Sequence, residues 1–249
     1  MPVLQNQVAI ITGASAGIGR ATATLFAAEG AAVVLNARAE EPLLELAAKI
    51  RSEGGAASVV PGDVALPQVH EQLVRAALRD FGGLDIAVNN VGTAYPLKPL
   101  ADLSDNEWKH ILDANLTSAF LGARSQIPAM LERGGGSIIF TSSFVGTSAG
   151  IPGMAAYGAA KSGLGGLVKG ITADYAARGI RANAVLSGGV DTALAGDDAQ
   201  KAWAAGLHAL KRIARPAEIA QAMLFLAGSM SSFVAGSAMY VDGGNAAVK

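Results

Sequence analysis

The chain has 249 residues, of which 51% are hydrophobic and only 16% are charged, and its formal net charge is −1. It contains no cysteine, which excludes disulfides, thiolate metal sites and cysteine nucleophiles and suits a reducing cytoplasm. No basic block interleaved with aromatic residues is visible, so nucleic acid is not an expected partner.

The first ten residues lack the basic start and long apolar core of a signal peptide, so we expect a cytoplasmic protein. From there, short apolar runs alternate with helical stretches. The expected strands are 8–12, 31–36, 56–60, 84–90, 136–142, 180–186 and 237–244. The expected helices are 17–29, 40–54, 67–80, 104–132, 155–178 and 216–228.

The charge-free run 134–160 is rich in glycine, serine and threonine, and it predicts a strand, a loop and a helix start rather than a membrane span. We therefore expect no membrane partner. SDNE (104–107) is a capping box that begins a long helix reaching about Glu132. The strands are continuous apolar runs, which predicts a parallel sheet with helices on both faces. We expect one α/β domain over residues 1–249, a doubly wound Rossmann fold.

The segment TGASAGIG (12–19) lies between the first expected strand and the first helix. Gly13 permits a sharp turn, and Gly17 leaves room for a phosphate at a helix N-terminus, whose N–H groups favour an anion. Gly19 permits close packing of helix on strand. The segment indicates a dinucleotide-binding turn, and the alternative is a turn whose glycines serve packing alone.

Two segments, 13–17 and 146–150, also match the G-x-S-x-G pattern of hydrolases and would make Ser15 or Ser148 a nucleophile. A triad needs a histidine on a late loop. The histidines of the chain are His70, His110 and His208. All fall in helical patterns, which favours ordinary solvated or packed side chains. A serine hydrolase stays as the alternative of another class.

The end of the second strand bears on the kind of dinucleotide. An acidic residue there would bind the ribose hydroxyls of NAD and reject a 2′-phosphate. Ala37 stands at that place, and Arg38 follows it. Because a guanidinium suits a phosphate, we expect NADP(H) to be preferred over NAD(H). The alternative is that Arg38 is only a surface cation.

Several short motifs occur along the chain in one order. They are TGASAGIG (12–19), GDV (62–64), NNVG (89–92), Asn115, SS (142–143), YGAAK (157–161) and GGVDT (188–192). Together they resemble those of a classical short-chain dehydrogenase/reductase over essentially the whole chain. The resemblance implies a seven-stranded sheet in the order 3-2-1-4-5-6-7, a homotetramer, and oxidoreductase activity between a ketone and a secondary alcohol. The subgroup that it looks most like is that of 3-oxoacyl-carrier-protein reductases and related carbonyl reductases. A non-catalytic dinucleotide-binding protein on the same fold remains an alternative.

The resemblance also implies roles for matching positions. The catalytic residues would be Asn115, Ser143, Tyr157 and Lys161. The cofactor-binding residues would be Gly13, Ser15, Gly17, Ile18, Gly19, Arg38, Asp63, Val64, Asn90, Gly92, Tyr157, Lys161, Gly188, Val190 and Thr192. Of these, Asp63 and Val64 would border the adenine. Val190 and Thr192 would hold the nicotinamide carboxamide.

Three positions depart from the family's pattern. Val91 replaces the alanine of its NNAG motif, and Ala16 stands where a basic residue is common, which leaves phosphate recognition to Arg38 and Ser15. Ser187 replaces the proline before Gly188. Since proline fixes such a turn, we expect serine to loosen the loop beside the nicotinamide.

Tyr157 and Lys161 are four residues apart and share one face of a helix. A free tyrosine has a pKa near ~10, and we expect the ammonium to lower it so that Tyr157 serves as general acid or base. Ser143 would hydrogen-bond the substrate oxygen, whereas alternation aims Ser142 at the other face. The family gives Asn115 a structural and proton-relay role. No cluster with metal-ligand spacing is visible, so we expect no metal.

The stretch 191–214 follows the sixth strand, and we expect it to form a lid over the substrate. The side chains expected to line an apolar pocket are Tyr95, Leu97, Phe144, Leu194, Trp203 and Leu207. The alternative is that they only pack the lid down. The pocket suits a ketone or a secondary alcohol, whose identity the sequence leaves open. Arg133 or Arg178 could meet an acidic carrier protein, although both also suit a helix end.

Overall fold

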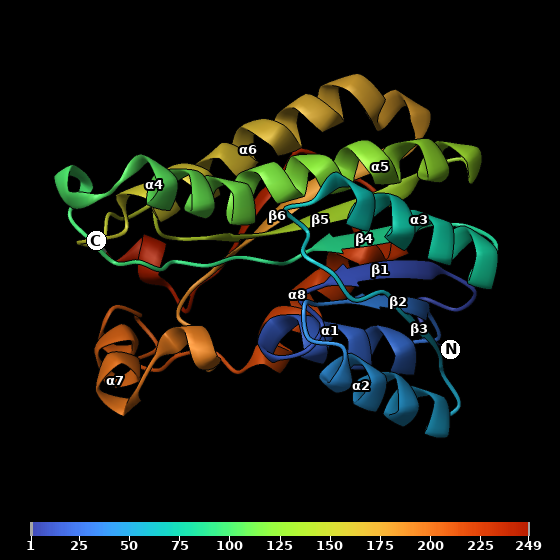
Figure 1. The fold of residues 1–249 in the computed structure, drawn as a ribbon, viewed down its shortest axis with the longest axis horizontal. Coiled ribbons are helices and arrows are strands. Elements are labelled where there is room, and N and C mark those ends of the chain that lie inside the picture. Colours follow the sequence, from blue (N-terminus) through green and yellow to red (C-terminus); the bar gives the residue numbers. More distant parts are fainter. Residues whose placement is uncertain (1, 249) are drawn as a thin grey trace.

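The computed structural model describes residues 2–248 and centres on a seven-stranded parallel sheet (Figure 1). The strands are β1 (Val8–Thr12), β2 (Ala32–Asn36), β3 (Ala56–Val59), β4 (Ile86–Asn89), β5 (Gly136–Ser143), β6 (Ile180–Ser187) and β7 (Ala238–Val241). They lie in the order β3-β2-β1-β4-β5-β6-β7. The doubly wound α/β fold and the expected strand order are therefore confirmed.

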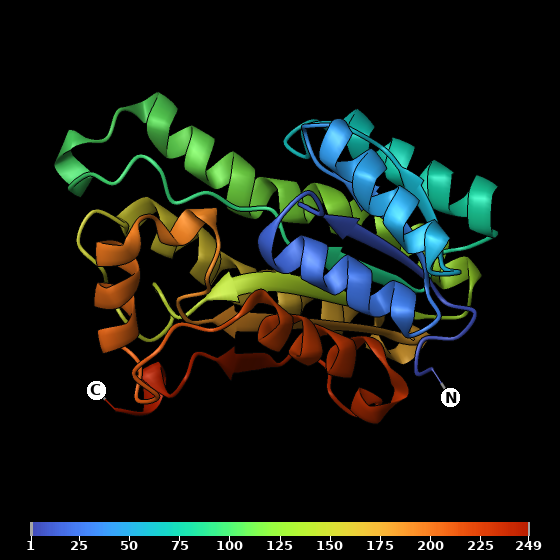
Figure 2. The ribbon, with the colours of Figure 1, turned by 90° about the horizontal axis from the view of Figure 1, so that it is seen from below.

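Helices cover both faces of the sheet (Figures 1 and 2). The first layer contains α1 (Gly17–Ala28), α2 (Glu41–Ser52) and α8 (Pro216–Ala227). The second contains α3 (Pro67–Phe81), α5 (Ser118–Glu132) and α6 (Ala155–Tyr175). Each layer buries a separate set of apolar side chains against one face of the strands. This double burial explains why the strands read as continuous apolar runs.

The expected helix 104–132 is interrupted in the structure. Its capping box is present, because the Ser104 hydroxyl accepts from the Glu107 N–H at 3.3 Å and the Glu107 carboxylate accepts from the Ser104 N–H at 2.9 Å. It begins α4 (Asp105–Leu112), which a π-helical turn at Asp113–Thr117 separates from α5. Such turns are rare and often occur at functional sites. Here the turn contains Asn115.

The carboxyl ends of the strands face the segment 191–214, which the sequence predicts to be a lid (Figure 2). Within that segment, α7 (Asp198–Gly206) contains no buried residue. Both α4 and α7 project beyond this edge of the sheet, α4 on the side of α5 and α7 on the side of α8 (Figure 1). Open α/β sheets bind ligands at their carboxyl edge. The two projections therefore flank the place where a ligand is expected.

Candidate active site

The turn between β1 and α1 depends on glycine. Gly13 and Gly17 have φ angles of +68° and +53°, a region that residues with a Cβ rarely adopt. A Cβ on Gly17 would also lie 2.9 Å from Thr192 Cγ2. The turn and the loop after β6 thus approach each other so closely that only a glycine fits between them.

No side chain of the sequence around its start caps the N-terminus of α1. Its N-cap, Ala16, has no side chain that could cap the helix, and the first turn contains no acidic residue. Ser15 and Ile18, two further residues predicted to bind the cofactor, flank this helix start and are half-buried. The N–H groups of the first turn therefore have the character of an anion site.

The end of β2 presents a cation to solvent. Ala37 is buried, whereas Arg38 is exposed, and among the described residues no hydrogen bond or ion pair engages its guanidinium. A guanidinium without a protein partner can receive a phosphate in bidentate fashion.

The loop after β3 is tied to the same edge by Asn36. This residue is fully buried, and its amide donates to the carbonyls of Val60 at 3.0 Å and Gly62 at 3.2 Å. The loop leads to Asp63, whose carboxylate accepts from the Ala65 N–H at 2.9 Å. Val64 is buried directly after it. The two residues expected to border the adenine therefore follow a firmly held turn.

Asn90 joins three strands at the centre of the edge. Its backbone N–H donates to Thr12 Oγ1 at 2.9 Å, and its amide donates to the Thr12 carbonyl at 3.1 Å. The Thr141 hydroxyl donates to Asn90 Oδ1 at 2.9 Å. Asn90 thus fixes the ends of β1, β4 and β5 relative to one another, in agreement with the supporting role that the resemblance implies.

Lys161 points from α6 to the end of β5. Its side chain is only 2% exposed, and Nζ donates to the Thr141 carbonyl at 2.7 Å. Burial lowers the pKa of the ammonium to about 8. A Cβ on Gly92 would lie 3.0 Å from Nζ and 2.6 Å from Asn115 Oδ1. Gly92 therefore lets the backbone pass between the lysine and the asparagine.

Asn115 explains the π-helical turn. Its amide donates to the Ile111 carbonyl one turn earlier and to the Thr93 carbonyl, both at 2.8 Å. Its Oδ1 accepts from the Thr93 N–H at 3.2 Å. A side chain that inserts into the hydrogen-bond ladder of a helix distorts it locally. The distortion anchors the loop after β4 and brings the asparagine next to Lys161.

Tyr157 and Ser143 meet at the end of β5. Their side chains are hydrogen-bonded, which lowers the pKa of the tyrosine, but burial raises it more. The net pKa of Tyr157 is therefore raised, and the expectation that it lies below the usual value is wrong for this structure. The main cause is the burial of the hydroxyl, which the Lys161 ammonium, 5.7 Å from the ring centroid and bonded to the Thr141 carbonyl, does not offset.

The two serines at the end of β5 point to different partners. Ser143 Oγ accepts from the Val145 N–H at 3.1 Å and reaches Tyr157, whereas Ser142 Oγ donates to the Lys161 carbonyl at 2.9 Å. Ser142 therefore fastens α6 to the sheet. Of the pair, Ser143 is the one in contact with the tyrosine.

The loop 188–192 is held by backbone bonds to the end of the lid. The Ala214 N–H donates to the Gly189 carbonyl, and the Asp191 N–H donates to the Ala214 carbonyl, both at 2.8 Å. Before the loop, the Ser187 hydroxyl donates to the Ser142 carbonyl at 3.4 Å. Val190 is buried and Thr192 half-buried. The loop therefore has defined anchors although it lacks the proline.

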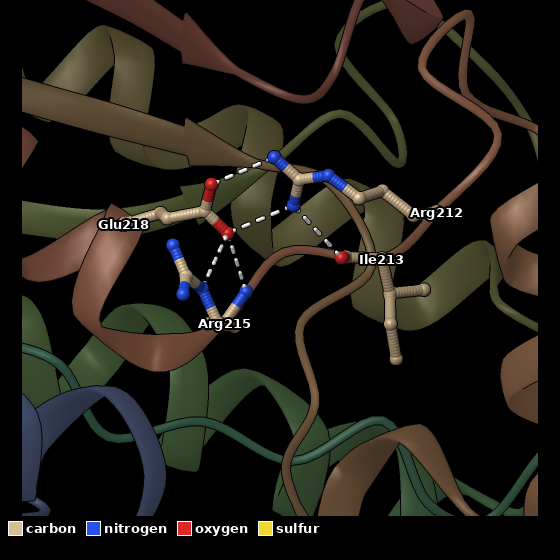
Figure 3. Close-up of polar contacts among 4 residues, drawn as sticks. All are labelled: Arg212, Ile213, Arg215 and Glu218. Atoms are coloured by element: carbon tan, nitrogen blue, oxygen red, sulfur yellow. Dashed lines mark hydrogen bonds and ion pairs between the residues drawn. The ribbon is translucent and has the colours of Figure 1, made fainter.

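The far end of the lid is fastened at the start of α8 (Figure 3). The Glu218 carboxylate accepts from the Arg212 guanidinium at 2.7 and 2.8 Å and from the Arg215 N–H at 2.8 Å. The bonds to Arg212 are the main cause that lowers the pKa of Glu218 to about 2. A second ion pair, Lys201 with Asp191 at 2.8 Å, joins α7 to the loop.

The apolar side chains expected to line the pocket differ in burial. Phe144 is buried and packs edge-on against His208, with ring centroids 5.9 Å apart. Leu207 is half-buried. The exposed ones are Tyr95, Leu97, Leu194 and Trp203. The lid and the loop after β4 thus carry apolar surface that this chain alone does not cover.

The histidines do not form a triad. His70 Nε2 is bonded to the Val64 carbonyl at 2.8 Å, and His208 Nε2 accepts from the Gly189 N–H at 3.0 Å. His110 is exposed on α4. Ser148, one of the serines considered as a nucleophile, donates to the Phe144 carbonyl at 3.3 Å. Neither buried imidazole therefore has its Nε2 available to a serine.

Within residues 2–248, no group of three or more His, Cys, Asp or Glu side chains could hold a metal ion. No helix in that part of the chain is both long enough and apolar enough to cross a membrane.

Comparison with known proteins identifies the family. Residues 13–246 match a family model described as Enoyl-(Acyl carrier protein) reductase. The chain is 37% identical to a cyclohexanol dehydrogenase of Acinetobacter sp. (strain SE19), over 96% of this chain and 94% of the relative. It is 40% identical to a cis-4-hydroxycyclohexanecarboxylate dehydrogenase of Sinomonas cyclohexanicum, over 98% of both chains.

The fold comparison agrees. The crystal structure of a short-chain type dehydrogenase/reductase from Mycobacterium marinum superposes with a TM-score of 0.93 at 34% identity, over 98% of this chain and 97% of that one. The chain belongs to the short-chain dehydrogenase/reductase family and has the features of its classical members. It is thus an oxidoreductase that acts on CH–OH groups with a nicotinamide cofactor, and its substrate is a small molecule.

Some residues of the site were not found from the sequence. Thr93 and Thr141 hold Asn115 and Lys161 mainly through backbone carbonyls, which no side-chain pattern can reveal. Thr12 could have been noticed, because it precedes the glycine turn and ends β1. His208 carried no signal beyond being a lone histidine in the lid.

Proposed function

We propose that the protein interconverts a neutral, ring-containing ketone with its secondary alcohol and prefers NADP(H) to NAD(H). The observation that carries the proposal is the hydrogen bond between Tyr157 and Ser143, one helical turn from the buried Lys161. A hydroxyl pair at the carboxyl edge of the sheet can hold one carbonyl oxygen from two sides. The Lys161 ammonium lies 5.7 Å from the centroid of the Tyr157 ring.

The residues around the glycine turn fit a dinucleotide. The uncapped N-terminus of α1 supplies donors for a pyrophosphate, and the glycine at position 17 leaves the space that a Cβ would fill. Bound nicotinamide would supply or remove the hydride at the carbinol carbon. Val190 and Thr192 would hold its carboxamide, because their loop lies against the turn.

The raised pKa of Tyr157 means that its hydroxyl is protonated at neutral pH. In the reductive direction, Tyr157 gives this proton to the substrate oxygen while Ser143 donates a hydrogen bond to the same oxygen. Lys161, with a pKa of about 8, is mostly protonated at neutral pH and stabilises the tyrosinate that remains. Asn115 keeps the loop beside Lys161 in place.

The preference for NADP(H) rests on Arg38. Its guanidinium is exposed, and it is not engaged by any other residue of the described chain. The buried neighbour Ala37 offers no carboxylate to the ribose hydroxyls. A 2′-phosphate would therefore meet a cation, whereas NAD(H) would lose the usual acidic partner.

The surroundings of the site favour a neutral substrate. Lys98 is paired with Glu107 at 2.5 Å, and Lys201 on the lid is paired with Asp191. Neither cation is free to bind a carboxylate. The exposed apolar side chains of the lid would be covered by a hydrocarbon ring. The relatives named after cyclohexanol and a hydroxycyclohexanecarboxylate support a ring-containing substrate, and of these two only cyclohexanol is neutral.

A 3-oxoacyl-carrier-protein reductase is the narrower candidate. The two arginines considered for contact with a carrier lie at the opposite edge of the sheet from Tyr157. Arg133 is paired with Asp85, just before β4, at 3.1 Å, and Arg178 stacks on Tyr175 just before β6. Neither arginine borders the site, so we prefer the free ketone as substrate.

We also propose a cytoplasmic homotetramer. Phe233 is fully exposed, Met230 is largely exposed, and both lie just before the edge strand β7. Trp108 and Phe120 are exposed on α4 and α5. Soluble monomers rarely leave so much apolar surface uncovered. Light scattering of the purified chain should give four times the chain mass, and a monomeric mass would contradict this proposal.

One mixing experiment tests the catalytic proposal against its rivals. Purified protein is incubated with NADPH or NADH and a panel of cyclohexanones, open-chain ketones and esters. We expect NADPH to be consumed with the cyclic ketones and no ester to be cleaved. Ester cleavage without cofactor would support a serine hydrolase instead. Cofactor binding without turnover on any ketone or alcohol would support a non-catalytic dinucleotide-binding protein.

A further inference from the structure

A buried histidine of the lid holds the loop that follows β6. His208 lies two residues after the end of α7 and is only 1% exposed. Its Nε2 accepts from the backbone N–H of Gly189 at 3.0 Å. The carbonyl of the same glycine accepts from Ala214 at 2.8 Å. Both polar backbone groups of Gly189 are thus bound by the lid.

The fit between the ring and the loop is close. A Cβ on Gly188 would lie 2.8 Å from His208 Cε1, and a Cβ on Gly189 would lie 3.1 Å from Nε2. On its other side the ring packs edge-on against Phe144. The imidazole therefore fills the space between the end of β5 and the loop. The loop cannot move toward the lid without displacing it.

The hydrogen bond defines the protonation state. Because Nε2 accepts from Gly189, the ring is neutral and its proton is on Nδ1. A second proton would place an N–H donor opposite the N–H of Gly189, and the bond would be lost. The hydrogen bond between Gly189 and His208 therefore exists only while the imidazole is neutral.

The charges around the ring are few. Gly188, Gly189 and Phe144 do not titrate, and Asp242 after β7 is the charged group described around the ring. Its carboxylate accepts from the N–H groups of Gly244 at 3.0 Å and Ala246 at 2.8 Å. Burial lowers the pKa of His208 from 6.5 more than Asp242 raises it. The neutral ring is thus the form favoured at physiological pH.

We infer that His208 is a positioning residue, whose neutral imidazole fixes the loop 188–192 to the lid and so orders the segment that receives the nicotinamide. The inference rests on the proposed function, because the contact of that loop with the cofactor belongs to the proposal. His208 provides a restraint where Ser187 replaces the proline that would otherwise fix the turn.

The test compares two replacements of His208. His208→Gln keeps an acceptor that can reach the Gly189 N–H, but it does not titrate. His208→Leu fills a similar volume without any acceptor. His110→Gln, on the surface of α4, is the matched control for the loss of a histidine. Cofactor affinity is measured by direct titration of each variant across the acid range.

NADH is the probe for the pH series, because the 2′-phosphate of NADPH itself titrates near ~6. In the wild type and in His110→Gln, we expect affinity to be full above the pKa of His208 and to fall as the pH drops through it. In His208→Gln the affinity at neutral pH is retained and the acid fall disappears. In His208→Leu the affinity is about tenfold lower throughout, since the buried N–H of Gly189 has no acceptor.

Two outcomes would overturn the inference. One is a His208→Leu variant whose cofactor affinity equals that of the wild type. The other is an acid fall that persists unchanged in His208→Gln. Either result can occur while the wild type still reduces ketones, so the proposed function would stand. A wild type that binds no dinucleotide would refute the proposed function itself.

Hydrogen exchange provides a readout without cofactor. Peptides that cover residues 188–192 should exchange faster in His208→Leu than in His208→Gln at the same pH. Acidification should remove the protection in the wild type and leave it in His208→Gln. Equal exchange in the two variants would show that the imidazole does not restrain the loop.

Discussion

The residues proposed to be catalytic and the helix α7 of the expected lid are held in place by different contacts. Lys161 and Asn115 are 2% and 1% exposed, and both are bonded to backbone carbonyls of other segments. The helix α7 of the lid has no buried residue, and an exposed ion pair, Lys201 with Asp191, links it to the loop after β6. The residues proposed for the chemistry are therefore anchored in the core, whereas α7, where we expect the substrate to bind, is attached at the surface.

The difference has an energetic meaning. A buried polar group that loses its partner costs about 1–3 kcal/mol, whereas an exposed ion pair contributes about 0–1 kcal/mol. Moving Tyr157 or Lys161 out of place would therefore cost more free energy than breaking an ion pair of the lid. The helix α7, unlike the buried His208 that follows it, can shift or be rebuilt at small cost, which would allow one catalytic arrangement to serve different ketones. If this contrast holds, substitutions at Tyr157 and Lys161 should have the largest effects and substitutions on α7 the smallest.

The first prediction concerns the proton donor. Tyr157→Phe removes the hydroxyl while keeping the ring, so we expect turnover to fall by about a thousandfold or more and cofactor affinity to be retained. Steady-state kinetics and cofactor titration measure the two effects. Tyr175→Phe, at the far end of the same helix, is the control. Substantial residual activity in Tyr157→Phe would refute the role of the tyrosine.

The second prediction concerns the buried cation. Since the pKa of Lys161 is about 8 against 10.5 for a free lysine, the unfolded chain binds more protons between these values. The free energy of unfolding should therefore gain a contribution of up to about 3 kcal/mol as the pH rises through this window. Lys161→Met should lack this gain.

Urea unfolding at about pH 7.5 and about pH 10 measures the contribution of Lys161 to the free energy of unfolding. Subtracting the values of the variant from those of the wild type removes the effects of other groups. Lys169→Met, exposed on the same helix, should behave like the wild type. If the free energy of unfolding depends on pH in Lys161→Met as it does in the wild type, then folding does not lower the pKa of Lys161.

The third prediction concerns the adenosine end. Arg38→Asp replaces the free guanidinium with a carboxylate, so it should lower kcat/KM with NADPH relative to NADH by about 10- to 100-fold. Arg75→Asp makes the same charge change on α3 and should leave the ratio unchanged. If Arg38→Asp also leaves the ratio unchanged, the preference for NADP(H) has another origin.

The sequence predicted the sheet well, because each strand is an apolar run that ends at a glycine or a polar turn. Residues 115, 143, 157 and 161 were named from the resemblance to the family, and the spacing of 157 and 161 predicts in addition that they share a helix face. The length of the last strand was overestimated, because the chain turns at Gly243 and Gly244, whose φ angles are +59° and +81°.

What the sequence missed depends on tertiary contacts. The π-helical turn arises because the Asn115 amide takes the Ile111 carbonyl and also binds Thr93, and the second contact cannot be read from helix propensity. The direction of the pKa shift of Tyr157 was misjudged because spacing predicts a nearby lysine but not the degree of burial. The bond between His208 and Gly189 joins a lone histidine to a backbone N–H, so no motif marks it.

The last prediction concerns the lid, where the expected effect is smallest. Trp203 is 55% exposed on α7, and a bound ring would cover part of its indole. Trp203→Ala should raise KM for a cyclic ketone by about 3- to 10-fold and leave kcat within about twofold, because the indole binds the substrate without touching the reacting atoms. The free energy of unfolding should change by less than about 0.5 kcal/mol.

Leu44→Ala, which removes an exposed apolar side chain from α2, is the control and should leave both kinetic constants unchanged. A Trp203→Ala variant that loses stability instead of affinity would mean that the tryptophan only packs the lid. A fall in kcat comparable to that of Tyr157→Phe would mean that the lid positions the reacting groups. In that case the contrast between a fixed catalytic centre and a loosely attached lid would fail, since both parts would then act as one unit.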